Sequence, residues 1–196
     1  MTVELREESL RRLEHLEREV SRLRAELLPE RRIEELPEVL DVLVAIVAGR
    51  LIALPLDAVL EVIPRVPFVR LPEAPPYMAG HMRWRGAHVP VVDATFLWTG
   101  HDLAPRRLED RIVVVRHGGA PRGLLVPEVH GVDRFRKAEW DAVAAGAGGA
   151  ELAVALAHRP EGSVLLVSLP HLFAAAPLPA QEPAQEPAQE PGEAVP

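Results

Sequence analysis

Cysteine is absent from this chain. Its absence excludes disulfide frameworks, thiol chemistry and cysteine-based zinc sites, and it fits a protein kept in a reducing compartment. Long apolar runs are missing as well, since no uncharged stretch approaches the ~18 residues of a membrane-spanning helix. The opening residues 1–12 are charged and lack the apolar core of a secretory signal. We therefore expect a cytoplasmic protein without direct membrane insertion.

Concentrated positive charge is also missing. The 196 residues carry a formal net charge of −7. Counted along the chain, residues 1–40 hold 8 Arg and 11 Glu for −3, residues 177–196 hold four Glu for −4, and the middle sums to zero. Affinity for phosphate backbones needs clustered Lys and Arg, so a neutral centre between acidic ends predicts no nucleic-acid partner.

The first 36 residues have the pattern of an amphipathic, coiled-coil-like helix. Apolar residues recur at spacings of three and four, at Leu13, Leu16, Val20, Leu23 and Leu27. One interpretation is a helix that associates with itself or with a partner through residues 10–28. The other is a helix laid against its own domain, and the pattern leaves both open.

The last twenty residues, 177–196, contain the motif Ala-Gln-Glu-Pro three times. Each proline disfavours helix at the preceding residue, and almost nothing apolar is available to bury. We expect an acidic, disordered tail. A solubilising terminus is the simpler interpretation, and a tether or docking motif is the other.

Residues 38–176 read as a series of short strands punctuated by glycine and proline. Strand segments are expected within 41–56, 56–63, 77–86, 88–94, 110–129 and 162–173. Hairpin turns are expected around Gly49–Arg50, at Arg85-Gly86 and within 117–122. The stretch 95–100 reads as a short helix that Gly100 ends. Strands joined by tight turns, with only single helical turns between them, predict a mainly β domain of the barrel type.

The segment 77–94 raises the question of chemistry because it contains His81, His88 and Asp93. A metal site is disfavoured, since Arg83 and Arg85 would oppose a divalent cation and none of the usual short ligand spacings is present. No nucleophile elbow and no phosphate-binding loop occurs either. We therefore predict no enzyme activity, no metal and no cofactor.

Structural roles account better for several of these residues. Asp93 is expected to cap the helical turn that follows it. For Arg85 two interpretations stay open: a buried structural arginine paired with Asp93 or Glu61, or a residue of a binding surface. For Trp84 and Trp98 the sequence leaves open whether they fill a core or belong to a binding surface, because tryptophan serves both purposes.

The segment 80–93, with Gly80, Arg85-Gly86 and Val89-Pro90-Val91-Val92-Asp93, resembles the signature of the CheW-like adaptor family. The segments 53–63, 111–132 and 163–173 follow in the family's order, so the resemblance covers about 41–175. It implies two intertwined five-stranded SH3-like barrels with a hydrophobic cleft between them. It also implies a non-enzymatic adaptor that couples chemoreceptors, the methyl-accepting chemotaxis proteins, to a CheA-type histidine kinase.

Carried over by position, the resemblance implies a receptor-binding surface and a set of structural residues. The receptor side would comprise Leu56, Val59, Glu61, Arg83, Trp84, Arg85 and Gly86. Gly80, Pro90 and Asp93 would be structural. Arg83 and Trp84 replace the family's asparagine and aliphatic residue, and Pro127 replaces an aspartate. These departures leave an alternative, a divergent scaffold that binds another partner or itself through its N-terminal helix.

Overall fold

The computed structural model describes residues 33–70, 72–101, 107, 109–143 and 152–176. Within these ranges the chain is mainly β. The strands are β1 Val39–Val47, β2 Arg50–Pro55, β3 Val59–Pro64, β4 Met78–Trp84, β5 Ala87–Asp93, β6 Arg111–His117, β7 Ala120–Val126, β8 Glu128–Arg136, β9 Trp140–Asp141, β10 Ala153–Arg159 and β11 Gly162–Val167. The helices are the 3-10 turns η1 Ile33–Glu35, η2 Leu56–Ala58 and η3 Lys137–Glu139, and the α-helices α2 Ala94–Thr99 and α3 Leu169–Ala175. The segments expected to form the N-terminal helix and the tail lie outside the described residues, apart from 33–36.

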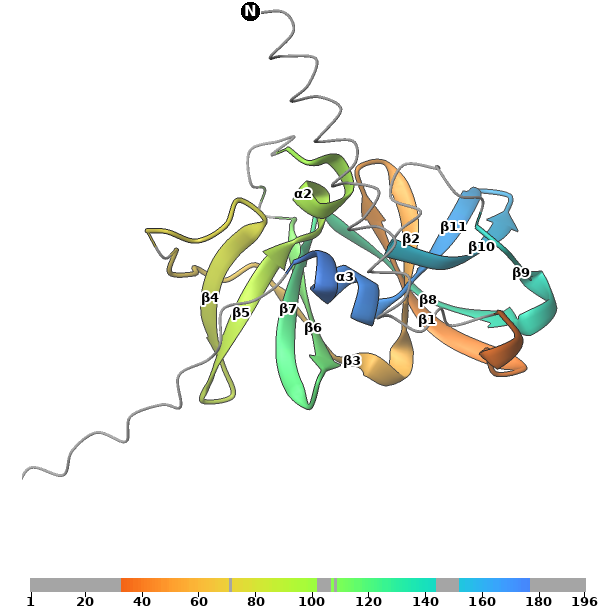
Figure 1. Cartoon of the computed structure of the whole chain (residues 1–196), viewed down its shortest axis with the longest axis horizontal. Coiled ribbons are helices and arrows are strands. Elements are labelled where there is room, and N and C mark those ends of the chain that lie inside the picture. Colours follow the sequence, from red (N-terminus) through yellow and green to blue (C-terminus); the bar gives the residue numbers. More distant parts are fainter. Residues whose placement is uncertain (1–32, 71, 102–106, 108, 144–151, 177–196) are drawn as a thin grey trace, which may run out of the picture.

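The strands form two sheets, and the chain passes from one to the other and back. One sheet has the order β8-β1-β2-β11-β10-β9 and the other has the order β3-β6-β7-β5-β4. Figure 1 shows the second sheet in the left half of the view and the first in the right half, with α3 between them. The mainly β, intertwined architecture expected from the sequence is confirmed. One sheet has six strands rather than five, because the two-residue β9 extends it.

Three hairpins turn on two residues that both have positive φ. The turns are Ala48-Gly49 with φ 51° and 74°, Arg85-Gly86 with 49° and 83°, and Gly118-Gly119 with 59° and 78°. Positive φ at both central positions is the mark of the type I′ turn, whose twist matches that of paired strands. The predicted hairpins are confirmed, although the first turn lies one residue earlier than Gly49–Arg50.

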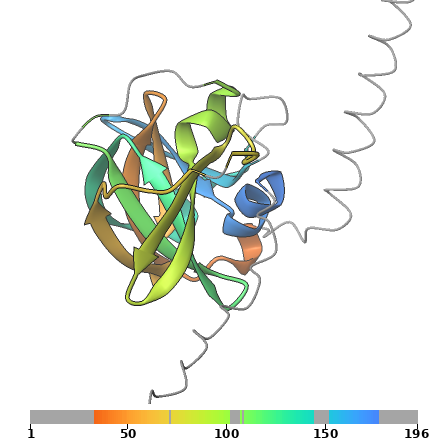
Figure 2. The same ribbon diagram turned by 90° about the vertical axis from the view of Figure 1, so that its left-hand side faces the viewer.

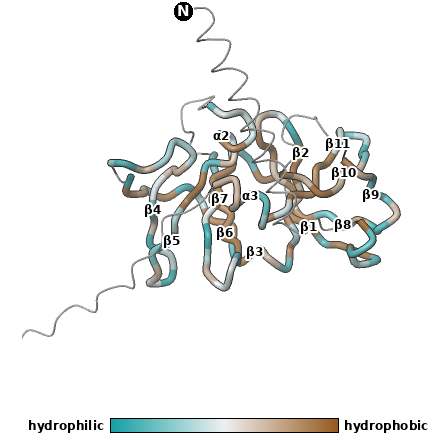
Figure 3. Tube along the Cα trace, viewed as in Figure 1, coloured by the Kyte–Doolittle hydropathy of each residue, from teal (hydrophilic) through white to brown (hydrophobic). Residues whose placement is uncertain are grey.

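Three apolar clusters hold the sheets together. One lies within the six-stranded sheet around Phe135 and Trp140, and another within the five-stranded sheet around Met82 and Ile112. The largest lies between the sheets and includes residues of both and of α3. Figure 3 shows the apolar stretches along the strands and the polar stretches at the hairpin tips. The strands of the two sheets come from interleaved parts of the sequence, so the apolar residues buried between the sheets hold distant parts of the chain together in one domain.

The strands β8 and β10 were not expected from the sequence. β8 carries four charged residues in nine, and β10 is rich in alanine, so neither shows a clear apolar alternation. β8 is held instead by pairing with β1 along its length, interrupted by one bulge at Val44/Ala45. Tertiary pairing thus overrides weak local preference here.

The packed domain also begins earlier than the expected boundary at 38. Leu36 is 4 % exposed within the cluster of the six-stranded sheet, and Ile33 packs against the same cluster. None of the helices in the described ranges is long and apolar enough to cross a membrane.

Candidate protein-binding surface

The Glu61 carboxylate joins the two edges of the five-stranded sheet. Glu61 lies on β3, and β4 is the strand at the opposite edge. Its Oε2 accepts hydrogen bonds from Trp84 Nε1 at 2.8 Å and from Arg85 Nη2 at 3.0 Å. The sheet therefore curls far enough for its first and last strands to meet, as in a small barrel.

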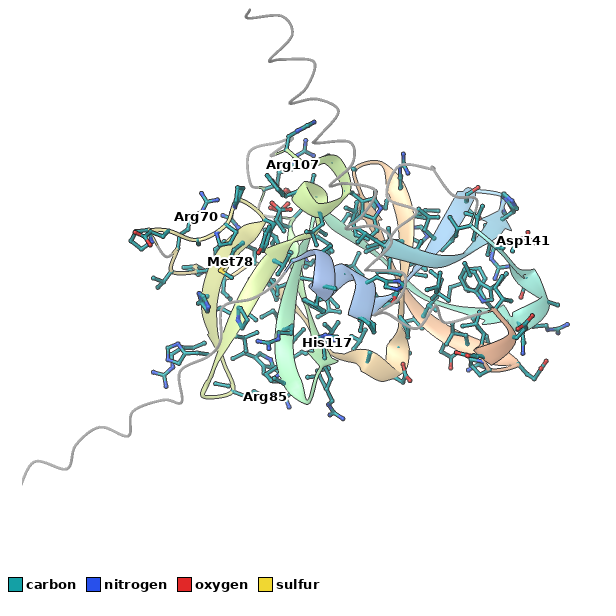
Figure 4. The ribbon with its side chains drawn as sticks, viewed as in Figure 1. Arg70, Met78, Arg85, Arg107, His117 and Asp141 are labelled. Atoms are coloured by element: carbon teal, nitrogen blue, oxygen red, sulfur yellow. The ribbon has the colours of Figure 1, made fainter. Side chains whose placement is uncertain are left out.

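The hairpin tip that carries Arg85 is built to hold the guanidinium in place. Arg85 has a φ of 49°, in the left-handed region that residues other than glycine rarely adopt, and Gly86 follows with a φ of 83°. Arg85 Cζ also lies 4.8 Å from the centroid of the Trp84 ring, within the range of a cation–π contact. Figure 4 labels Arg85 at the lower end of the β4–β5 hairpin. A charged group is thus presented on a stiff turn.

Exposure differs among the three side chains of this cluster. The Arg85 side chain is 69 % exposed and that of Glu61 38 %. Trp84 is half-buried and packs against the apolar interior of its sheet. Of the alternatives left open by the sequence, Arg85 pairs with Glu61 and is not buried. Trp84 is both a core residue and the base of an exposed ion pair. Because water screens this pair, its own contribution to stability is at most about 1 kcal/mol.

The other residues expected on the receptor side lie elsewhere. Leu56, at the start of η2, and Val59, at the start of β3, are half-buried against the cluster between the sheets. Arg83 is exposed on the opposite face of β4 from Trp84, since successive side chains of a strand alternate. The structure thus brings Glu61, Trp84, Arg85 and Gly86 together and separates them from the other three.

Gly80 is required by a close approach of two backbones. Val69 and His81 exchange hydrogen bonds, with Val69 N donating to His81 O at 2.9 Å and His81 N donating to Val69 O at 2.8 Å. A Cβ at Gly80 would lie 2.7 Å from Val69 O, and Gly80 has φ 149°. Only glycine fits here without displacing the segment around Val69.

Asp93 and Pro90 have places inside the sheet. Asp93 is 2 % exposed, and its Oδ1 accepts hydrogen bonds from Thr95 N at 2.8 Å and Phe96 N at 3.3 Å. It is the N-cap of α2, which ends at Gly100 with φ 76°, as the sequence predicts. Pro90 is buried in β5 opposite His81.

The histidines of this segment do not gather with carboxylates. His81 lies on the face of β4 opposite Trp84, and burial lowers its pKa, with a smaller effect from His88. Asp93 is occupied as a helix cap. Across the described ranges, no group of three or more His, Asp or Glu side chains could hold a metal ion.

A second charged cluster, on the six-stranded sheet, was missed by sequence reasoning. Arg159 Nη1 lies 2.6 Å from Glu139 Oε1, and Arg159 Nε lies 3.6 Å from Asp133 Oδ2. The Arg159 Cζ also lies 4.0 Å from the centroid of the Phe135 ring. β8 and β9, the edge strands of this sheet, are linked directly by η3, so the cluster closes this sheet as Glu61 closes the other. The only local signal is an arginine at a strand end, which does not identify partners twenty residues away.

Comparisons with known proteins bear on the family and the fold of this chain. The family model described as the CheW-like domain matches residues 41–176. Protein PilI of Pseudomonas aeruginosa is 34 % identical over 88 residues, which are 44 % of this chain and 48 % of PilI. The chain thus matches about half the length of that relative. The crystal structure of the scaffolding protein TtCheW from Thermoanaerobacter tengcongensis is similar in fold, with a TM-score of 0.64 and 24 % sequence identity over 68 % of this chain and 92 % of TtCheW.

Proposed function

The chain belongs to the CheW-like domain family, and we propose that it is a non-enzymatic adaptor that couples chemoreceptors to a CheA-type histidine kinase in a bacterial chemosensory array. Its place would be the cytoplasm, at receptor arrays, held there by its partners. The family match over most of the described domain supports the adaptor role. The likeness in fold to a protein described as a scaffolding protein supports it as well.

The observation that carries the proposal is the cluster of Glu61, Trp84 and Arg85. It presents a carboxylate and a guanidinium of fixed geometry on the surface, beside an aromatic ring. Arginine and tryptophan are enriched at the energetic centres of protein interfaces. A type I′ hairpin and a curled sheet hold the three side chains, so little freedom is lost when a partner binds.

The partner surface on the receptor is expected to be polar with an apolar centre. The exposed Arg85 guanidinium has donors left after its single bond to Glu61, because a guanidinium carries five. A carboxylate or a backbone carbonyl of the receptor can accept from these donors. Gly86, next in the turn, has nothing within 4 Å of where a side chain would begin, so a partner backbone can approach it.

Reconstitution with purified partners tests this function. The full chain is mixed with the cytoplasmic fragments of chemoreceptors and the CheA-type kinase from the same organism, and both co-sedimentation and autophosphorylation are measured. We expect the chain to join receptor and kinase in one pellet and to raise kinase activity. Glu61→Arg should lose both effects while keeping its thermal transition. No binding to any receptor or kinase, together with wild-type signalling in a deletion strain, would refute the proposal.

Deleting residues 1–32 separates the proposal from its alternative, a scaffold that acts through the N-terminal segment. The deletion stops before Ile33 because Ile33 and Leu36 belong to the packed domain. Receptor and kinase binding should survive the deletion. Loss of all binding in a shortened chain that still melts cooperatively would favour the alternative.

A further inference from the structure

One face of the five-stranded sheet carries a set of basic side chains that the candidate site does not use. Alternation along the strands places His81 and Arg83 of β4, His88 of β5 and Arg122 of β7 on the same side of this sheet. This side is the one that packs, further along the strands, against the other sheet. We call these four residues the cationic face. It is the opposite side from the barrel interior.

Strand register gives the layout of the cationic face. His81 is opposite Pro90, and Arg83 is opposite His88, in the pairing of β4 with β5. On β7, Gly123 is opposite Val91 of β5, so Arg122 lies level with Pro90 and His81. The buried Pro90 thus forms the floor between Arg122 and His81. Arg83 and Arg122 are two strands and two residues apart, a diagonal of ~12 Å at the usual strand spacing and rise.

The two arginines of this face have no acidic partner within the described ranges. Arg83 is exposed and Arg122 half-buried, and neither forms an ion pair with a described residue. Arg122 Nη1 is buried without a hydrogen-bond partner. Burying a guanidinium nitrogen away from water without a hydrogen-bond acceptor is unfavourable. An acceptor for Arg122 Nη1 would therefore be stabilising, and the described residues do not supply one.

The end of the described chain lies on the same side of the sheet. α3 ends at Ala175, and Ala176, 0 % exposed, packs in the cluster between the sheets with Val92, Val115 and Leu124. His117, the residue after Arg116 on β6, stacks on Phe173 of α3 at 4.9 Å between ring centroids. Figure 2 views the molecule from the side of the five-stranded sheet, with α3 beside it. The described part of the chain therefore ends on the side of the sheet that carries the cationic face.

The sequence of this last segment complements that face in charge and in spacing. It contains Glu182, Glu186, Glu190 and Glu193 and no basic residue. In an extended polyproline II chain, which rises ~3.1 Å per residue, glutamates four residues apart are separated by ~12 Å. That separation equals the diagonal between Arg83 and Arg122. At ~3.3 Å per residue the six residues from Ala176 to Glu182 can span ~20 Å, enough to reach across the sheet.

We propose that the acidic segment 177–196 docks on the cationic face of its own domain, with successive glutamates of the Ala-Gln-Glu-Pro repeat pairing with Arg122 and Arg83. The repeat gives several equivalent registers, which raises the local concentration of carboxylates at the two arginines. Arg83 lies on the opposite face of β4 from Trp84, so the docked segment and the Glu61 cluster occupy different faces of this strand. The docking itself does not depend on the proposed adaptor function.

A spin label on the full chain tests the docking. The chain has no cysteine, so Ala188→Cys provides a single attachment site for a nitroxide. We expect the amide signals of residues around Arg83, His88 and Arg122 to lose most of their intensity, relative to the reduced label, at low salt. The intensity should return at ~1 M salt, where the Debye length falls to ~3 Å.

Matched variants identify the charges responsible. Replacing the four tail glutamates by glutamine, or making Arg83→Gln or Arg122→Gln, should restore the signals. Arg116→Gln is the control. Arg116 is an exposed arginine of β6, the strand that forms a hairpin with the β7 strand of Arg122, but its side chain points to the side of the sheet opposite the cationic face. It should leave the broadening unchanged. Arg83→Gln alters an exposed residue only, so its result does not depend on the fold of the Arg122 variant.

Three outcomes would overturn the proposal. The first is an absence of broadening on the cationic face at low salt. The second is broadening that persists when the tail glutamates are replaced. The third comes from a mixture of isotope-labelled chain without the nitroxide and unlabelled chain with it, because broadening in that mixture means that the tail contacts a second copy rather than its own domain.

Discussion

The Glu61 carboxylate accepts a hydrogen bond from Trp84 Nε1 at 2.8 Å although β3 and β4 are the two outermost strands of their sheet. This bond and the Arg85 ion pair beside it therefore join the two edges of the sheet, and they also lie at the protein surface. The same carboxylate thus holds the barrel closed and positions the exposed Arg85 guanidinium.

Exchanging the charges of Glu61 and Arg85 should separate these two roles. Glu61→Arg alone and Arg85→Glu alone remove the pair, and we expect each to lower receptor affinity by about tenfold or more, as losing ~1.4 kcal/mol would. The double variant restores a pair of opposite charges. All three variants should stay within about 1–2 kcal/mol of the parent in stability, because an exposed pair contributes little and Trp84 Nε1 loses a single hydrogen bond. Receptor affinity should stay low, since the partner meets reversed charges. Isothermal titration and urea denaturation measure the two quantities, and full recovery of affinity in the double variant would show that the pair acts only by shaping the sheet.

Replacing Asp93 should destabilise the domain through the loss of a helix cap. In Asp93→Ala the amides of Thr95 and Phe96 lose their acceptor, and the free energy of unfolding should fall by about 0.5–2 kcal/mol. Asp93→Asn keeps an acceptor oxygen at the same position and should retain most of that free energy. The midpoint of urea denaturation measures both. Equal destabilisation by Asn and Ala would mean that the charge of Asp93, rather than its capping bonds, is what matters.

Gly80→Ala should be more damaging than the same change at another glycine with positive φ. The new methyl group would lie 2.7 Å from Val69 O, so overpacking adds to backbone strain and the loss should reach about 2–4 kcal/mol. Gly49 is the matched control, with φ 74° and nothing within 4 Å of the added atom. There the change should lower stability by only ~1 kcal/mol. Thermal denaturation of both variants decides between them, and similar losses would show that the contact with Val69 yields easily.

The acid sensitivity of the six-stranded sheet should depend on Glu139. Its carboxylate accepts a hydrogen bond from Arg136 N and pairs with Arg159, and both lower its pKa below the ordinary value of 4.5. A carboxyl whose pKa is lowered on folding stabilises the fold above its unfolded pKa, and that contribution is lost as the pH falls below 4.5 toward the folded value. Glu139→Gln should therefore flatten the decline of stability with acid over this window. Urea midpoints measured as a function of pH test this, and an unchanged slope would contradict it.

Local signals allowed the hairpins to be predicted, because glycine in a two-residue turn acts through its own backbone. Gly118-Gly119 and Arg85-Gly86 are such turns. The strands β8 and β10 could not be predicted in this way, because they are defined by their neighbours. Arg134 of β8, for example, pairs with Asp41 of β1, at 2.6 Å between Nε and Oδ1.

The candidate site was predicted in part for the same reason. The cap at Asp93 follows from the sequence, since a cap bonds residues two and three positions away. The partner of Arg85 remained open between Asp93 and Glu61, because the choice depends on which strands lie at the sheet edges. The family resemblance implies one receptor-binding surface for Arg83 and Trp84, but strand alternation places their side chains on opposite faces of β4.

The path of the chain between the two sheets sets an order for folding during synthesis. The five-stranded sheet is built from the single stretch 59–126, so it can be completed as soon as that stretch has left the ribosome. The β1–β2 hairpin is made first, yet both of its sheet neighbours, β8 and β11, are made only after the five-stranded sheet. Both outer edges of the hairpin therefore stay unpaired until β8 is made, and the β2 edge stays unpaired until β11 is made near the end of the domain. Non-local pairing of this kind is slow and prone to aggregation. Fragments cut near Pro127 should for this reason regain the native fold only when both halves are present.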